Sequence, residues 1–255
     1  MNINKIVKMK NNKYKIFIDD EVLITYDNVI LANDLLYKKS IDKKTYIKMI
    51  SDTNYYDVYN KVVNYILKRR RSEKEIVLYL NKFSLGENEK NGIIEKLRDI
   101  KLIDDIEFCR AYINDKLYLS KDGILKIKND LLKQNIPLDI IEDALNNIDK
   151  NIIDDRLEKM IIKKIRTNNK YSNSYLKQKI LNEMMNKGYN KEKILNIIDS
   201  NINNDNDILN KEFNKIYDNL SKKYSGYDLE NNVKQRLISK GFKIGDINLL
   251  LDQKK

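Results

Sequence analysis

The residue types that most often carry out enzyme chemistry are almost absent from this sequence. It contains no histidine, which excludes Ser-His-Asp and Cys-His catalysis and any histidine-bound metal. The single cysteine, Cys109, excludes an intrachain disulfide and a cysteine-cluster zinc site, and its position between Phe108 and Tyr112 predicts a buried thiol. No glycine-rich phosphate-binding motif occurs either. We therefore expect no enzyme activity, no cofactor and no metal.

Two acidic pairs, Asp104-Asp105 and Asp154-Asp155, remain as candidates for carboxylate chemistry, either as metal ligands or as a general acid and base. Each pair directly precedes an apolar helical stripe, where an aspartate commonly caps the N-terminus of a helix. Their recurrence at one position of a repeat favours capping over catalysis.

Basic residues are the other chemical feature, because Lys and Arg outnumber Asp and Glu by 49 to 38 and give a formal net charge of +11. Such an excess favours polyanions, most commonly nucleic acid, although a sequence dominated by Asn, Lys and Ile is also typical of AT-rich coding. The densest cluster, Lys68 to Arg71, is either a solvated helix terminus or a contact for phosphate or an acidic partner. The candidate contact residues are Arg69, Arg70, Arg71, Lys74, Lys82, Arg110, Lys121, Lys126, Lys128, Lys163, Lys164, Arg166 and Lys170.

The elements that position these residues begin with a distinct N-terminal segment. Residues 1–26 contain short, partly alternating apolar runs rich in β-branched and aromatic residues, separated at Asn11-Asn12 and Asp19-Asp20. This pattern predicts a three-stranded antiparallel meander. The helices predicted next run from Asp27 or Asn28 through Leu36, from Ser40 or Asp42 through Ile50, and from Asn54 to Arg70.

A period of 53 residues then runs through the chain. Leu176, Ile180, Met184, Lys187, Gly188, Tyr189 and Ile194 recur as Leu229, Val233, Leu237, Lys240, Gly241, Phe242 and Ile247. Ile127 and Leu131 precede Ile180 and Met184 by the same interval, and Ile76 and Leu80 stand 51 positions further upstream. Each unit is predicted to contain a first helix, a short basic joint, a second helix, and a third helix that follows Asp104-Asp105, Asp154-Asp155 or Asn204-Asp205.

The helix ends of these units can be assigned from local chemistry. Serine or aspartate followed three residues later by glutamate is a capping box. Glycine suits the left-handed position that ends a helix, Asn135 takes that position in the second unit, and Pro137 suits the first turn of the helix that follows. The predicted caps are Ser72, Glu75, Asp104, Glu107 and Asp154 at N-termini and Gly188 and Gly241 at C-termini.

The predicted fold class is therefore mainly α, with tandem three-helix repeats forming an elongated or curved right-handed-type solenoid and a small antiparallel three-stranded β segment at the N-terminus. The expected divisions are 1–53 for the meander and short helices, 54–118, 119–170 and 171–223 for three repeats, and 224–255 for a truncated fourth repeat. Tyr118, Tyr171 and Tyr224 recur at intervals of 53. They could stack nucleic-acid bases beside cations, but a role in wedging the repeats together is favoured.

The motif around the first repeat resembles the RecX family. It consists of Arg71 to Ile76, with the pattern Arg-Ser-x-x-Glu-aliphatic, then Leu80, then Ile103 to Tyr112, with the pattern aliphatic-Asp-Asp-x-x-Phe-small-Arg-Ala-Tyr. Cys109 stands where the family usually has alanine. The resemblance implies a cytoplasmic bacterial regulator that binds RecA and the RecA–DNA filament. Such a regulator inhibits filament extension, ATP hydrolysis and strand exchange in homologous recombination, DNA repair and the SOS response.

Two other functions are compatible with the residues themselves. A basic helical-repeat module could bind single- or double-stranded nucleic acid directly through phosphate contacts, or the chain could be an adaptor for another acidic protein. No apolar run approaches the roughly 18 residues of a membrane helix, so we expect a cytoplasmic protein with no membrane contact. A monomer is expected.

Overall fold

The N-terminal segment folds as a three-stranded antiparallel sheet in the order β1-β2-β3, as predicted. The computed structural model describes residues 1–10, 13–202 and 206–254. The strands are β1 (Ile3–Lys8), β2 (Lys13–Ile18) and β3 (Glu21–Tyr26). Asp19 adopts a positive φ of 46° in the tight turn between β2 and β3, a conformation that aspartate tolerates better than most residues.

Two helices follow, and they differ from the prediction. Helix α1 (Asp27–Ala32) ends four residues earlier than expected and has no side-chain cap. Asp42 caps α2 (Lys43–Leu67), as predicted, by accepting a hydrogen bond from the Thr45 amide at 2.6 Å. However, α2 is one continuous helix of 25 residues, so the two separate helices predicted for this region are wrong.

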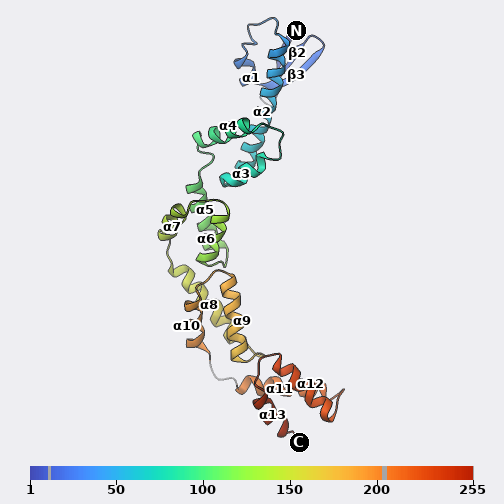
Figure 1. The fold of residues 1–255 in the computed structure, drawn as a ribbon, viewed down its shortest axis with the longest axis vertical. Coiled ribbons are helices and arrows are strands. Elements are labelled where there is room, and N and C mark those ends of the chain that lie inside the picture. Colours follow the sequence, from blue (N-terminus) through green and yellow to red (C-terminus); the bar gives the residue numbers. More distant parts are fainter. Residues whose placement is uncertain (11–12, 203–205, 255) are drawn as a thin grey trace. The chain divides into compact units, whose positions relative to one another are not determined.

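Thr53 lies inside α2, between the two helices that the sequence predicted. Its hydroxyl donates to the Met49 carbonyl at 2.7 Å within the same helix, and it also contacts the Thr25 hydroxyl of β3 at 2.5 Å. Thr53 is therefore buried in the sheet–helix interface. Figure 1 shows the strands beside the first half of α2. The core between them contains Ile16, Ile18, Val29, Ile30, Leu35, Ile41 and Met49.

The remaining chain is a series of helices arranged as repeats, which confirms the predicted fold class. The first repeat contains α3 (Glu73–Leu80), α4 (Glu87–Asp99) and α5 (Asp105–Leu119). The second contains α6 (Ile124–Lys133), α7 (Leu138–Asn146) and α8 (Asn151–Arg166). The third contains α9 (Asn173–Asn186), α10 (Lys191–Asn201) and α11 (Asn206–Leu220), and the shorter fourth contains α12 (Gly226–Ile238) and α13 (Ile244–Asp252).

The apolar positions that define the period are the ones that fill the core. Ile76, Leu80, Ile127 and Leu131 are fully buried, as are Met184 and its counterpart Leu237. Tyr189 and Phe242, which follow the joints, are also buried. The 53-residue spacing therefore reports equivalent packing in successive repeats.

The joints between first and second helices have the predicted backbone conformation. Gly188 and Gly241 have φ of 83° and 84°, and Asn135 has φ of 62°. The Gly188 joint also contacts the preceding repeat: Gly123, just before α6, donates from its amide to the Lys187 carbonyl at 2.7 Å. An added Cβ at Gly188 would overlap the backbone of Lys126. Glycine is therefore required here both for conformation and for close approach.

The same contact recurs one repeat later. The Ser172 amide, before α9, donates to the Lys240 carbonyl at 3.1 Å. A Cβ added at Gly241 would lie 2.5 Å from the Cβ of Tyr175. The start of a first helix thus docks on the joint of the following repeat, a tertiary contact that periodicity alone does not reveal.

The predicted third-helix cap at Asp154 is wrong. Helix α8 begins at Asn151, with Lys150 at its N-cap, so Asp154 lies within the helix. Its carboxylate instead forms an ion pair with Lys193 of α10 at 2.6 Å. The corresponding prediction at Asn204-Asp205 lies outside the described residues.

By its contacts the chain divides into two compact units, one of residues 1–108 with 134–136 and one of residues 109–133 with 137–255. The expected division at residue 53 falls inside α2, whereas those at 118, 170 and 223 lie near the ends of α5, α8 and α11. Among the described residues, no helix has the length and apolar character required to cross a membrane.

Candidate partner-binding surfaces

The arginine cluster after α2 is held by the capped start of α3. Arg69 donates two hydrogen bonds to the Glu75 carboxylate, at 2.5 and 3.2 Å, and Arg71 lies 3.5 Å from the same carboxylate. Arg71 is also packed over the Tyr65 ring at 4.0 Å, which leaves only 13% of its side chain exposed. Two of the three arginines are therefore paired within the molecule, and they share the single negative charge of Glu75.

Arg70 is the most exposed member of the cluster. Its side chain is 63% exposed, and the nearest carboxylate, that of Glu107, lies 3.6 Å away. Arg70 lines a pocket of about 330 Å³ together with Lys101 and Asp104. Solvent screening weakens such an exposed ion pair, so Arg70 can exchange Glu107 for an acidic group on a partner.

The caps around this cluster are confirmed and they position it. Ser72 and Glu75 form the predicted capping box, and the Ser72 hydroxyl also donates to Gln134 at 2.9 Å. Asp104 accepts a hydrogen bond from the Glu107 amide at 2.9 Å, as predicted. Asp105, beside it, accepts from the Glu73 amide at 3.0 Å.

Asp105 is a structural carboxylate, and its surroundings affect its proton affinity. Burial raises the pKa of Asp105 above its usual value, while the hydrogen bond from the Glu73 amide opposes that rise. Glu73 itself is held by Arg98 at 2.5 Å. The carboxylates of Asp104 and Asp105 are therefore explained by hydrogen bonds to backbone amides at helix starts. No group of three or more Cys, Asp or Glu residues in the part of the chain described is arranged to hold a metal ion.

Two basic candidates of α6 are also engaged within the fold. Lys126 pairs with Asp122 at 2.7 Å, and Lys128 pairs with Glu142 at 2.8 Å. The Asp122 carboxylate is shared with Lys116 at 3.1 Å. Burial of Asp122 opposes its ionisation, but hydrogen bonds from Lys126 and Lys116 outweigh it and lower its pKa. Exposed candidates in and around the first two repeats include Lys82, Arg110 and Lys121.

The outward face of α8 differs from these neutralised clusters. Lys159, Lys163 and Arg166 are exposed at intervals of about one turn, and none has an ion-pair partner among the residues with described positions. They border two shallow hollows of about 480 and 430 Å³ on the same helix, whose lining includes the apolar residues Ile152, Met160 and Ile162 and also the charged residues Asp155 and Arg156. We call Lys159, Lys163 and Arg166, with these three apolar residues, the α8 face. It offers cations beside aliphatic surface.

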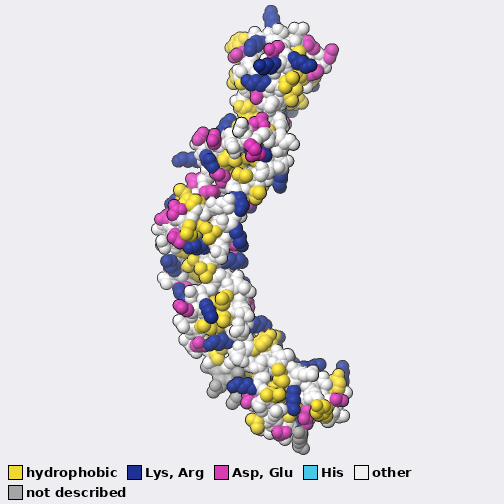
Figure 2. Space-filling view, viewed as in Figure 1, with side chains coloured by type: hydrophobic (Ala, Val, Ile, Leu, Met, Phe, Trp, Pro, Cys, Tyr) yellow, Lys and Arg dark blue, Asp and Glu magenta, His cyan; other side chains and the backbone are white. Residues whose placement is uncertain are grey.

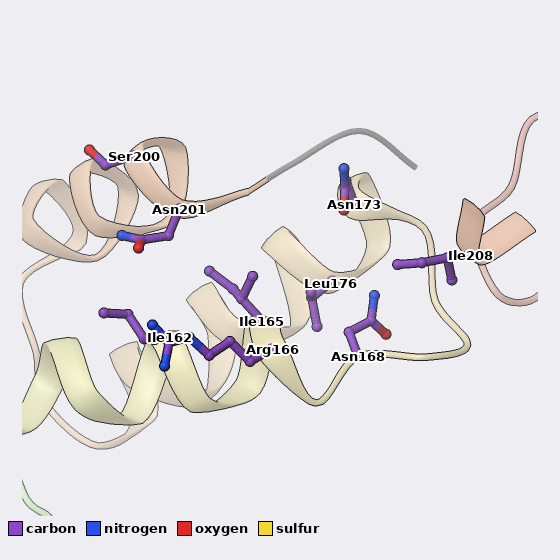
Figure 3. A pocket seen from close by; sticks show the side chains of 9 residues that line it. All are labelled: Ile162, Ile165, Arg166, Asn168, Asn173, Leu176, Ser200, Asn201 and Ile208. Atoms are coloured by element: carbon purple, nitrogen blue, oxygen red, sulfur yellow. The ribbon is translucent and has the colours of Figure 1, made fainter. Parts of the chain in front are cut away.

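Arg166 also reaches a second pocket, of about 360 Å³, between α8, α9, α10 and the start of α11. Figure 3 shows its guanidinium beside Ile162, with Ser200 and Asn201 of α10 on the opposite side. The sequence identified Lys163 and Arg166 but missed Lys159. The spacing of all three on one helical face was the available signal. Lys164, by contrast, pairs with Glu183 at 2.7 Å.

An aromatic and basic cluster lies between α8 and α9. The rings of Tyr171 and Tyr175 stack with centroids 4.9 Å apart, and the ammonium groups of Lys170 and Lys179 lie 5.2 and 4.6 Å from the Tyr171 centroid. Lys170, Tyr171 and Lys179 line a pocket of about 160 Å³. The sequence included Lys170 and Tyr171 but missed Lys179, which lies a further two turns along the chain.

The three periodic tyrosines do not share one environment. Tyr118 is 70% exposed and Tyr224 is 42% exposed, which does not fit a role as wedges between repeats. Cys109 is fully buried, as predicted. Across the visible face, Lys and Arg side chains are interspersed with acidic and hydrophobic ones (Figure 2). The basic candidates therefore form separate clusters.

Comparison with known proteins gives a consistent assignment, although no family model matches the chain. Regulatory protein RecX of Streptococcus agalactiae is 29% identical over 261 residues, with 98% of each chain covered. RecX of Bacillus pumilus is 27% identical over 258 residues, again with 98% of each chain covered. RecX of Listeria monocytogenes is 29% identical over 188 residues, which is 72% of this chain and 70% of the relative.

Solved structures support the fold. A crystal structure of regulatory protein RecX matches with a TM-score of 0.67 and 22% identity, covering 78% of this chain and 98% of that one. RecX from Lactobacillus salivarius matches with a TM-score of 0.52 and 26% identity, covering 58% and 96%. The capped first repeat, the buried period and these relatives agree: the chain is similar in sequence and in fold to the regulatory proteins named RecX.

Proposed function

We propose that this chain is a non-catalytic regulator that binds the RecA recombinase and its DNA filament, as the family resemblance implies. The observation that carries the proposal is the α8 face, where Lys159, Lys163 and Arg166 lack ion-pair partners among the described residues and lie beside aliphatic side chains. Acidic side chains on a protein partner would pair with these cations, while aliphatic side chains of the partner would pack against Ile152, Met160 and Ile162.

The experiment is a titration of the single-strand-dependent ATPase of RecA with this protein at two salt concentrations, with binding to free DNA measured in parallel. We expect the ATPase rate to fall at less than one protein per RecA, under salt conditions where free-DNA binding is negligible. A change in ATPase only where the protein competes for bare DNA would contradict regulation through RecA.

The α8 face is tested by reversing its charges. The triple variant Lys159→Glu, Lys163→Glu, Arg166→Glu should raise the concentration needed for half-maximal inhibition of the RecA ATPase about tenfold. The reason is that three positions that would pair with acidic groups of RecA would instead repel them. The matched control reverses Lys211, Lys215 and Lys222, which are exposed on or just after α11, the third helix of the next repeat. Equal effects of the two triples would indicate a general charge effect.

Arg70 supplies a smaller test of the arginine cluster. Arg70→Gln removes the exposed charge and leaves the Glu75 pairs of Arg69 and Arg71 intact. A weakened filament affinity is expected, and an unchanged affinity would exclude Arg70 from the contact.

A second candidate function is direct binding of single-stranded nucleic acid. The observation that favours it is the Tyr171 and Tyr175 stack flanked by Lys170 and Lys179. Stacked aromatic rings beside cations can bind bases and phosphates together. This function predicts that Tyr171→Leu weakens binding of an oligonucleotide in the absence of RecA, and that affinity falls steeply with salt.

A further inference from the structure

The outer face of the N-terminal sheet is apolar where a solvated sheet face is normally polar. The strand register places Val7, Lys15 and Ile24 side by side, and Lys5, Phe17 and Val22 in the adjacent row. We call these six residues the outer sheet face. Val7, Val22 and Ile24 are 37%, 47% and 42% exposed, which is high for large aliphatic residues in neighbouring strands.

The opposite face already contains the core. Ile16, Ile18 and Thr25 are fully buried, and Thr25 contacts Thr53 of α2. Because side chains alternate along a strand, the residues of the outer sheet face cannot join that core without a shift in register. Their apolar character therefore has no packing role within the N-terminal unit.

The charges on this face are all positive. Lys5 and Lys15 occupy its only two charged positions, and the Lys15 ammonium lies 4.9 Å from the centroid of the Phe17 ring. The nearby acid Glu21 belongs to the other face, where it hydrogen-bonds Tyr46. A complementary surface must therefore combine aliphatic and acidic side chains.

Other occupants fit less well. A second copy of the chain would bring the same lysines toward each other across a two-fold axis, and six residues bury far less than the roughly 800 Å² per partner of a stable interface. Nucleic acid would find two cations but no free ring to stack on, since Phe17 is half-buried beneath Lys15.

We propose that the outer sheet face docks an acidic segment with aliphatic side chains on the protein that this chain regulates. This inference rests on the proposed function, in which that protein is RecA in its filament. The sheet is a docking surface additional to the α8 face, and it adds contact area without forming the whole interface.

The test is the variant Val22→Thr, Ile24→Thr, which replaces the aliphatic surface but keeps β-branched residues that favour strands. We expect filament affinity, measured by biolayer interferometry on RecA assembled on single-stranded DNA, to fall about tenfold. The control Leu36→Ser, Tyr37→Ser alters two residues of the same unit that are 58% and 89% exposed but lie outside the strands. Circular dichroism of each variant checks that the fold is retained.

A second variant, Lys5→Glu, Lys15→Glu, tests the charge. It should weaken filament binding at low salt, and the difference from the wild type should shrink as salt is raised. This variant changes the charge of the same face without altering any buried residue.

The outcomes separate the two proposals. If the wild type binds the filament and the Val22→Thr, Ile24→Thr variant binds it equally well, the sheet inference is overturned. The proposed function would still stand. Failure of the wild type to bind the filament would overturn the proposed function, and the sheet inference with it. A third outcome concerns vesicles of phosphatidylserine and phosphatidylcholine. If the wild type binds them, the double threonine variant does not, and filament binding is the same for both, the face would be assigned to an anionic membrane. That result would overturn the proposal of a protein partner.

Discussion

Arg71 shows that a basic residue in this chain can have a structural role. Its guanidinium lies over Tyr65 and near Glu75, while its neighbour Arg70 remains exposed. The two residues are adjacent and chemically identical, yet only Arg70 is available to a partner. Whether an arginine of this cluster can contact a partner therefore depends on which acidic and aromatic side chains of the chain itself lie beside it.

Ser72 gives a residue-scale prediction. Ser72→Ala removes the acceptor of the Glu75 amide and the hydrogen bond to Gln134, so it should lower the free energy of unfolding by about 1 kcal/mol or more. The matched control is Ser225→Ala, because Ser225 holds the N-cap of α12 without a side-chain cap bond. Urea unfolding followed by circular dichroism would measure both. Equal losses would contradict the cap's contribution.

Asp57 gives a prediction for pH. It accepts hydrogen bonds from Lys13 at 2.7 Å and Tyr26 at 2.6 Å. Burial opposes ionisation of Asp57, but these hydrogen bonds outweigh it and hold the pKa below the usual 3.8. A carboxylate with a lowered pKa stabilises the fold above its unfolded pKa, and this contribution is lost as the pH falls through its folded pKa.

Asp57→Asn should therefore lower the free energy of unfolding by about 1 kcal/mol at pH 7. The difference from the wild type should narrow as the pH falls below about 4, where the wild-type carboxylate also loses its charge. Urea unfolding at several pH values measures this. A difference that is constant down to pH 2 would exclude ionisation of Asp57 as its cause.

At the scale of elements, α2 and α8 show how tertiary contacts change helix boundaries. A buried hydroxyl pair continues α2 through Thr53, and α8 begins a turn before the acidic pair that was expected to cap it. The early start of α8 places Asp154 against Lys193 of α10. It also places Arg156 where its guanidinium donates to the carbonyls of Leu117 and Ser120 at the end of α5.

Gly188 tests the joint between first and second helices. Gly188→Ala forces a side chain into a position with φ of 83° and into the backbone of Lys126, so it should destabilise the protein by more than about 1 kcal/mol. Gly245→Ala is the control, because no atom lies within 4 Å of the added Cβ and Gly245 is helical. That change should be neutral or stabilising by up to about 1 kcal/mol. Thermal unfolding distinguishes the two, and equal melting temperatures would contradict the close-approach argument.

At the largest scale, the third and fourth repeats bury apolar surface on each other. Phe213 of α11 is only 2% exposed because it shares a cluster with Leu229, Val233 and Leu237 of α12. The shorter fourth repeat therefore covers the third, and it also supplies the Lys240 carbonyl to the start of α9.

Deletion of residues 221–255 should accordingly expose the α11 stripe. We expect increased binding of a hydrophobic dye, lower solubility and a lower melting temperature, since the buried apolar surface of α11 becomes accessible to solvent. Deletion of only 253–255 removes residues after α13 and serves as the control. A longer deletion that remains soluble without dye binding would show that α11 is stable without this cover.

The sequence by itself determined the repeat period, the meander, the capping box at Ser72 and the left-handed joints at Gly188 and Gly241. These features depend on local conformational preferences and on the periodic burial of apolar residues, and short stretches of sequence are enough to determine both. The resemblance to the RecX family rests on the same kind of local motif.

Only the tertiary structure decided which charges are neutralised and which face outward. Lys193 meets Asp154 and Arg98 meets Glu73 through helix packing between residues 39 and 25 positions apart, so no local pattern identifies these pairs. Lys159, Lys163 and Arg166 remain exposed and form no ion pair with a described acid, although Asp155 lines the same hollow as Lys159 and Lys163. Strand register likewise places Val7, Val22 and Ile24 on one face, because side chains of β1 and β3 share a face only when both strands pair with β2.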